Sequence, residues 1–142
     1  MTTILEIADK VTAKLNAASL SQTFEATRLY VPNFDLSDLK ELRVTVVPRE
    51  IDLLPLDRAS NRVHAMIDVA VQKKFKKGDA TEIDPLVQFV EEVGDEFRLK
   101  RLTDFPQARC VKVQNSVLYS VEHWEQQRQF TSLLTLTFEL AR

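Results

Sequence analysis

Apolar and polar residues alternate over a long stretch near the middle of the chain. Within RVHAMIDVAVQKKF, the segment Arg62–Phe75, the odd-numbered positions are Val63, Ala65, Ile67, Val69 and Val71. A two-residue period is typical of a strand with one buried face, whereas a helix would spread these residues around too much of its circumference. We therefore predict a long central strand with Ile67 in the core. His64 and Asp68, at even positions, are interpreted as part of a solvated face.

Four further segments have the composition and pattern of strands. They are Gln22–Val31, Leu42–Pro48, Cys110–Val121 and Phe130–Leu140. Pro32 ends the first of them, because proline has no amide hydrogen to donate to a neighbouring strand. In the last segment apolar residues alternate with threonines, and we expect the threonine-rich face to meet solvent or a neighbouring subunit.

Apolar residues at helical spacing predict two amphipathic helices. The first covers about residues 3–18, and the second carries its apolar stripe over Leu86–Phe97 after a cap at Thr81 or Asp84. Covering a sheet is the default role of such a stripe, and binding a partner is the alternative.

The order of elements is helix, strand, strand, strand, helix, strand, strand. Consecutive strands with short connections favour antiparallel pairing, and two amphipathic helices are enough to cover one face of a sheet. We therefore predict a single α+β domain over residues 1–142, with a largely antiparallel five-stranded sheet and two helices packed on one face.

Three segments remain outside the predicted elements and are candidate contact surfaces. Arg49–Asn61 is a long connection without a clear period, and such loops often form interfaces. Lys73–Asp79 is a basic tip, and the polar connection His123–Gln129 holds the only tryptophan, a residue type enriched at interfaces. The predicted interface residues are Arg49, Asp52, Asp57, Arg58, Arg62, Lys73, Lys74, Lys76, Lys77 and Trp124. A solubilising role for the lysines and packing of the tryptophan under its own loop are the alternatives.

The composition argues against most kinds of chemical site. A net charge of −2 is not that of a general nucleic-acid binder, and two glycines cannot build a Gly-rich phosphate loop. Cys110, His64 and His123 do not have the close spacing of zinc ligands. No apolar run approaches the roughly 18 residues of a membrane helix. We predict no cofactor, no metal and no catalytic residue.

Several segments over about residues 3–141 are recognisable together by their order and spacing. They are Phe24-x-Ala26-x-Arg28-x-Tyr30, Leu42-x-Val44-x-Val46-Val47-Pro48 followed by Arg49, Arg58 ahead of RVHAMIDVAVQKKF, the Leu86–Phe97 helix, and Arg128-x-Phe130-x-Ser132 at the start of the last strand. None of these is a specific motif by itself. Together they resemble the tail terminator (tail completion) proteins of long-tailed bacteriophages and prophages.

The resemblance implies a virion protein that is made in the host cytoplasm and assembles as a hexameric ring. Such a ring sits on the head-proximal end of the tail tube, ends tube polymerisation and offers the surface to which the head attaches. The implied partners are further copies of the chain, the tail tube protein and a head-completion or connector protein. Neither a membrane nor a specific nucleic acid is implied, and no reaction is catalysed.

Two alternative functions stay open. One is a minor capsid or head-completion protein, from a family neighbouring the terminators. The other is a small enzyme or regulator whose site is assembled between subunits, with contributions from Arg49, Asp52, Asp57, Arg58 and Arg62.

Overall fold

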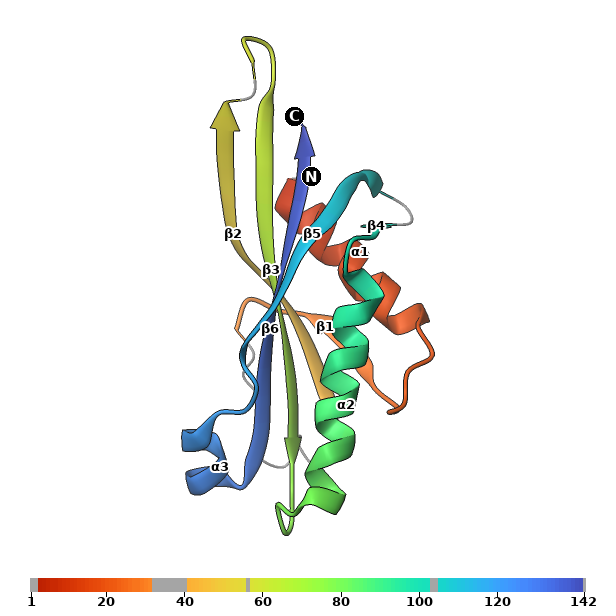
Figure 1. Cartoon of the computed structure of the whole chain (residues 1–142), viewed down its shortest axis with the longest axis vertical. Coiled ribbons are helices and arrows are strands. Elements are labelled where there is room, and N and C mark those ends of the chain that lie inside the picture. The colour runs from red at the N-terminus through yellow and green to blue at the C-terminus, as the bar shows by residue number, and fades with distance from the viewer. Residues whose placement is uncertain (1–2, 32–40, 56, 103–104, 142) are drawn as a thin grey trace.

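A twisted sheet with its two long helices on one side organises the chain (Figure 1), in a computed structural model that describes residues 3–31, 41–55, 57–102 and 105–141. The elements, in chain order, are α1 (Thr3–Ala17), β1 (Glu25–Arg28), β2 (Arg43–Pro55), β3 (Asn61–Lys74), α2 (Ala80–Phe97), β4 (Arg101–Leu102), β5 (Phe105–Val117), α3 (Val121–Gln127) and β6 (Gln129–Ala141). The strands lie in the order β1-β2-β3-β6-β5-β4.

The prediction of an α+β fold is confirmed, and its details are corrected. Among the described residues the sheet has six strands rather than five, and α3 is a third helix. β4 has only two residues and α3 only seven, so neither spans enough periods to be recognised from its pattern. β5 begins at Phe105 rather than Cys110 and ends at Val117 rather than Val121.

One pair of strands departs from the antiparallel arrangement. β1 pairs with β2 in parallel, while all the other described pairs are antiparallel. Parallel neighbours require a connection that returns to the end where the first strand began. Most of that connection, residues 32–40, lies outside the described residues, and so does Pro32, which was predicted to end the first strand.

β3 is the centre of the sheet, paired with β2 on one side and with β6 on the other. Ile67, near its middle, lies between Pro48 and Leu136. The apolar residues at the odd positions of β3 are fully buried, in one core cluster with the buried residues of α1 and α2. The predicted central strand and its buried face are therefore confirmed.

α2 begins before both predicted caps. Its N-cap is Asp79, whose carboxylate accepts a hydrogen bond from the backbone N–H of Glu82. Thr81 and Asp84 consequently lie inside the helix, and so does Pro85. The predicted apolar stripe of this helix is buried.

The opposite face of the sheet, which carries the even-numbered residues of β3, is referred to below as the polar face. Asp68 accepts a hydrogen bond from the Thr135 hydroxyl at 2.8 Å, and its side chain is only 14 % exposed. His64 Nε2 lies 2.8 Å from a carboxylate oxygen of Glu139. Thr135 and Thr137 are buried. The prediction of a solvated face is therefore wrong here, because polar side chains of adjacent strands bind one another.

The buried face of β3 can be tested by a matched pair of substitutions. Ile67→Ala should lower the free energy of unfolding by about 2–5 kcal/mol, because it leaves a cavity in the core. Ile51→Ala, at a position of β2 that is 37 % exposed, should cost less than about 1 kcal/mol. Urea denaturation of both variants measures the difference, and equal midpoints would contradict the assignment of the buried face.

Candidate assembly surfaces

The segment predicted as a long loop, Arg49–Asn61, is largely strand. β2 and β3 remain paired up to Pro55 and Asn61, so only the residues between them form a turn. A β-bulge between Pro48 and Glu50 shifts the register. Because a bulge inserts one residue, the apolar side of β2 moves from even positions to odd ones, which hides the period in the sequence. The loop prediction is corrected to a hairpin, called the arm below.

The arm projects past the helices at one end of the molecule (Figure 1). Ile51, Leu53 and Leu54 are 37 %, 54 % and 45 % exposed. The parallel pairing with β1 stops at Val46, which accepts a last hydrogen bond from the N–H of Leu29. Among the described residues, no strand pairs with the outer edge of β2 beyond that point. Such an edge is a template for pairing with another strand.

The predicted contact residues of the arm have different surroundings. The Asp57 carboxylate accepts hydrogen bonds from the N–H groups of Ala59 and Ser60, both at 2.8 Å, and from the Ser60 hydroxyl. These bonds lower the pKa of Asp57 and hold the turn. Arg49 reaches the polar face, where its Nη1 lies 3.4 Å from the Thr135 hydroxyl and 3.7 Å from the Asp68 carboxylate.

Three other predicted contact residues of the arm are exposed. They are Asp52, which lies opposite His64, Arg62, which lies opposite Leu54, and Arg58 in the turn.

The lysines and the tryptophan gather at the other end of β3, called the lysine end below. β3 has 14 residues, so the two ends are roughly 45 Å apart. Lys74, Lys76 and Lys77 are exposed, and Lys73 is half-buried. Apart from Arg49, which reaches Asp68 in the middle of β3, the predicted interface residues therefore lie on two separate surfaces.

Trp124 lies in α3, so the polar connection predicted over His123–Gln129 is corrected to a helix, capped by the Ser120 side chain. Its ring packs against Phe75, with centroids 4.5 Å apart, and against Tyr119 at 5.3 Å. Gly78 adopts a left-handed φ of 71°, and a Cβ there would meet the Phe75 ring at 2.9 Å. Trp124 thus packs over the base of the basic tip and fixes its shape.

Glu82 organises the basic tip, although the sequence pattern did not single it out. Its carboxylate accepts hydrogen bonds from the backbone N–H groups of Lys76, Lys77 and Gly78 at 2.8–3.2 Å. These bonds lower the pKa of Glu82. The Arg128 guanidinium adds a bond to the Lys76 carbonyl. The lysine side chains are therefore displayed from an ordered backbone.

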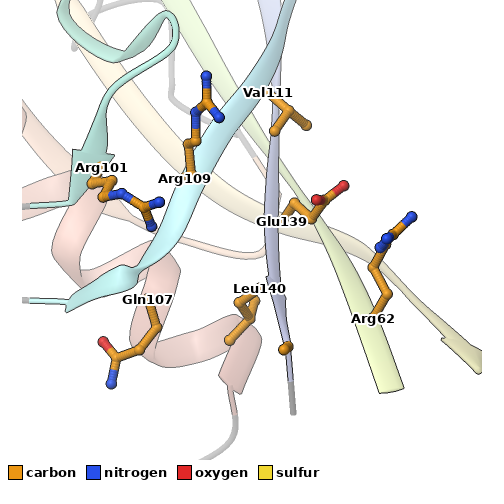
Figure 2. A pocket seen from close by; sticks show the side chains of 8 residues that line it. Arg62, Arg101, Gln107, Arg109, Val111, Glu139 and Leu140 are labelled. Carbon is orange, nitrogen blue, oxygen red and sulfur yellow. The ribbon is translucent and has the colours of Figure 1, made fainter. Parts of the chain in front are cut away.

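A third surface lies on the polar face, near the start of β5. A hollow of about 260 Å³ is lined by Arg62, Arg101, Gln107, Arg109, Val111, Glu139, Leu140 and Ala141 (Figure 2). We call it the arginine hollow. Among its described lining residues, Glu139 alone carries a carboxylate, and this carboxylate is bound to His64. Arg101 and Arg109 were missed by the sequence analysis because they come from β4 and β5, which only the pairing of these strands brings together.

The residues most suited to chemistry are dispersed. Cys110 is fully buried, and loss of solvation raises the pKa of its thiol to about 11. His123 lies in α3, with its Nδ1 2.9 Å from the Thr131 hydroxyl, at the other end of β3 from His64. Within the described ranges, no group of three or more His, Cys, Asp or Glu side chains is placed to hold a metal ion. None of the helices described is long and apolar enough to cross a membrane.

Comparison of the chain with protein-family models and with curated proteins finds no match. The likeness to tail terminators therefore rests on the order and spacing of the sequence segments named above.

The role of Glu82 can be tested by amide hydrogen exchange. Glu82→Ala should speed exchange at Lys76, Lys77 and Gly78 severalfold at neutral pH, because their N–H groups lose a charged acceptor. Glu91→Ala, at an exposed position of the same helix, is the control and should leave these amides unchanged.

The same amides should respond to acid in the unmodified protein. The pKa of Glu82 is lowered, so its contribution is complete above the ordinary glutamate pKa and disappears as the pH falls through the lowered value. Tip amides that stay equally protected in Glu82→Ala, and in acid, would contradict this role.

Proposed function

We propose that this protein is a tail terminator of a phage or prophage, a virion protein made in the host cytoplasm. In this proposal, six copies form a ring on the head-proximal end of the tail tube. The ring stops polymerisation of the tube protein and provides the surface to which the head-completion or connector protein attaches. The observation that carries the proposal is the ordered set of sequence segments that resembles this family.

Size and geometry support a ring. A chain of 142 residues has a radius of gyration of roughly 14 Å, too small to cover the end of a tube alone. A closed ring requires a heterologous contact, in which one patch meets a different patch on the next subunit. The chain offers two unlike surfaces for such a contact, namely the free edge of the arm and the outer edge of β5. They lie along opposite edges of one sheet.

The position of the two surfaces at opposite ends of β3 supports binding of two different partners. In a ring whose axis follows the strands, the arms would lie at one face of the ring and the lysine ends at the other. A terminator has to contact the tube on one side and the head on the other. Chemically distinct ends suit this task, since the arm presents apolar side chains with charges of both signs, and the lysine end presents four lysines beside exposed Tyr119.

No specific observation favours the alternative of an enzyme assembled between subunits. The residues assigned to that alternative do not converge, because Asp57 is bonded within its own turn and Arg49 reaches Asp68. The arm holds them along a strand and its turn rather than around a cavity.

The function is tested first in a phage that lacks this protein. Electron microscopy should show tail tubes of uncontrolled length without heads, and supply of the protein should restore tails of uniform length. In dilute solution the pure protein should be monomeric or in a monomer–hexamer equilibrium, which light scattering over a concentration series measures. Normal tails with heads in its absence would refute the proposal.

The lysine end is tested by charge reversal. Replacing Lys73, Lys74, Lys76 and Lys77 by glutamate should leave the thermal midpoint nearly unchanged, because the charged groups lie at the surface. Attachment to tail tubes or to heads should weaken, most strongly at low salt, because the contact would carry reversed charge. Attachment that is equal to the unmodified protein at low and moderate salt would exclude a role for these lysines.

A further inference from the structure

We propose that the free edge of the arm pairs with the outer edge of β5 in a second copy of this chain, so that one sheet continues from subunit to subunit. The inference rests on the proposed ring and names the contact that closes it. It follows from the pairing of the strands, their directions and the charges along the two edges.

Among the described residues, each edge of the sheet is covered over only part of its length. On one side, β1 pairs with β2 from Arg43 to Val46, which leaves the edge from Val47 to Pro55. On the other edge, β5 is covered by Arg101 and Leu102 of β4 and by the Lys100 carbonyl. This carbonyl accepts a hydrogen bond from the N–H of Cys110. From Val111 to Val117, no described strand covers the outer edge of β5. Both uncovered edges carry exposed apolar side chains, namely Ile51, Leu53, Leu54, Val111 and Val117.

The directions of the two edges are compatible. β2, β3, β6 and β5 are joined by three successive antiparallel pairings, so β2 and β5 run in opposite directions. Rotation about an axis along the strands preserves these directions. The arm of one copy therefore arrives antiparallel to β5 of its neighbour, which is the arrangement already present throughout the centre of the sheet.

The two free edges lie at different heights along the strands. Gln114, in the middle of the β5 edge, is level with Val47, since both align with Asp68 through the pairing register. The middle of the arm edge is Ile51, which aligns with Ala65, three β3 residues from Asp68, and is therefore roughly 10 Å higher along the strands. The sheet between the edges is four strands wide, or roughly 19 Å. This stagger corresponds to a strand tilt of about 28°, shallower than the 35–45° typical of closed barrels.

The charges on the polar face are complementary. Glu50 and Asp52 lie on this face of the arm, opposite Met66 and His64. Lys112 lies on the same face of β5, opposite Thr137. In a continued sheet, residues of one face remain on one face, so the acids of the arm become cross-strand neighbours of Lys112.

The arginine hollow extends the basic side of this contact. Arg109 lies on the polar face of β5, opposite Glu139, and borders the hollow with Arg101 (Figure 2). None of Glu50, Asp52, Lys112 and Arg109 forms an ion pair with another described residue. The charges on both edges are therefore available to a second copy.

Disulfide trapping tests the contact directly. A register that places Asp52 opposite Lys112 also places Glu50 opposite Gln114, and opposed residues have Cβ atoms close enough for a disulfide. Glu50→Cys and Gln114→Cys are made as separate variants, mixed at ring-forming concentration and oxidised. Cross-linked heterodimers are expected only in this mixture. Glu50→Cys mixed with Glu91→Cys is the control, and the native Cys110 is buried.

A charge swap supplies an independent measurement on the same contact. Asp52→Lys and Lys112→Asp should each weaken association by up to about fivefold per contact at low salt, the range of cross-strand charge pairs. The chain carrying both substitutions should recover, because every contact regains an opposite pair. Recovery in the double variant cannot result from a general loss of folding.

Each other outcome overturns the inference in a distinguishable way. Rings that form without the Glu50–Gln114 cross-link, and that are unaffected by the charge swap, would leave the terminator function standing but remove this contact. Homodimers of Glu50→Cys alone would indicate an isologous pairing of two arms. Cross-linking of the arm to tube protein instead would assign the edge to that partner. A chain that forms no oligomer, either in solution or on tubes, would refute the ring and the contact together.

Discussion

The whole structure depends on β3, whose backbone is paired on both sides and whose two faces are chemically different. Its odd positions are buried beneath the helices, and its even positions form a polar face with hydrogen bonds such as that from Thr135 to Asp68. A slip of one residue would turn apolar side chains to the polar face and break these bonds. The register of β2 and β6 against β3 is therefore fixed, and with it the position of the arm.

The fixed register also determines which edges stay open. β2 and β5 are both longer than the strands that cover them, so each leaves several residues without a described neighbour. Exposed edges favour unspecific pairing, and charged side chains and proline commonly limit it. Glu50, Asp52 and Pro55 on the arm and Lys112 on β5 fit this role. The same charges disfavour pairing between two like edges and favour pairing of the arm with β5. Protection from unspecific pairing and selection of the correct partner edge therefore have one physical origin.

The lysine end illustrates how charges are displayed on a stiff support. Glu82 binds three successive backbone N–H groups of the tip, and Trp124 packs against Phe75 below it. These contacts fix the backbone while the lysine side chains remain at the surface. Less conformational entropy is lost when such a surface binds a partner than when a flexible loop must be ordered first.

The local pattern of the sequence by itself determined the elements that repeat over several periods. The alternation in Arg62–Phe75 located the central strand and its buried face, and the apolar stripe of Leu86–Phe97 located the second helix. The α+β class followed from their order, because side-chain period is a property of neighbouring residues. Of the candidate contact residues, the pattern identified exposed positions such as Asp52 and Lys76, but it also selected Asp57, which serves its own turn.

Only the tertiary structure decided what depends on residues far apart in the chain. The bulge at Pro48–Glu50 turned an apparent loop into an arm, because pairing with β3 continues across the change of period. Arg101 and Arg109 met at the arginine hollow through strand pairing, and Glu82 reached the basic tip through the start of α2. The open edges of β2 and β5 have no local signal at all, because an edge is defined by the neighbour that a strand lacks.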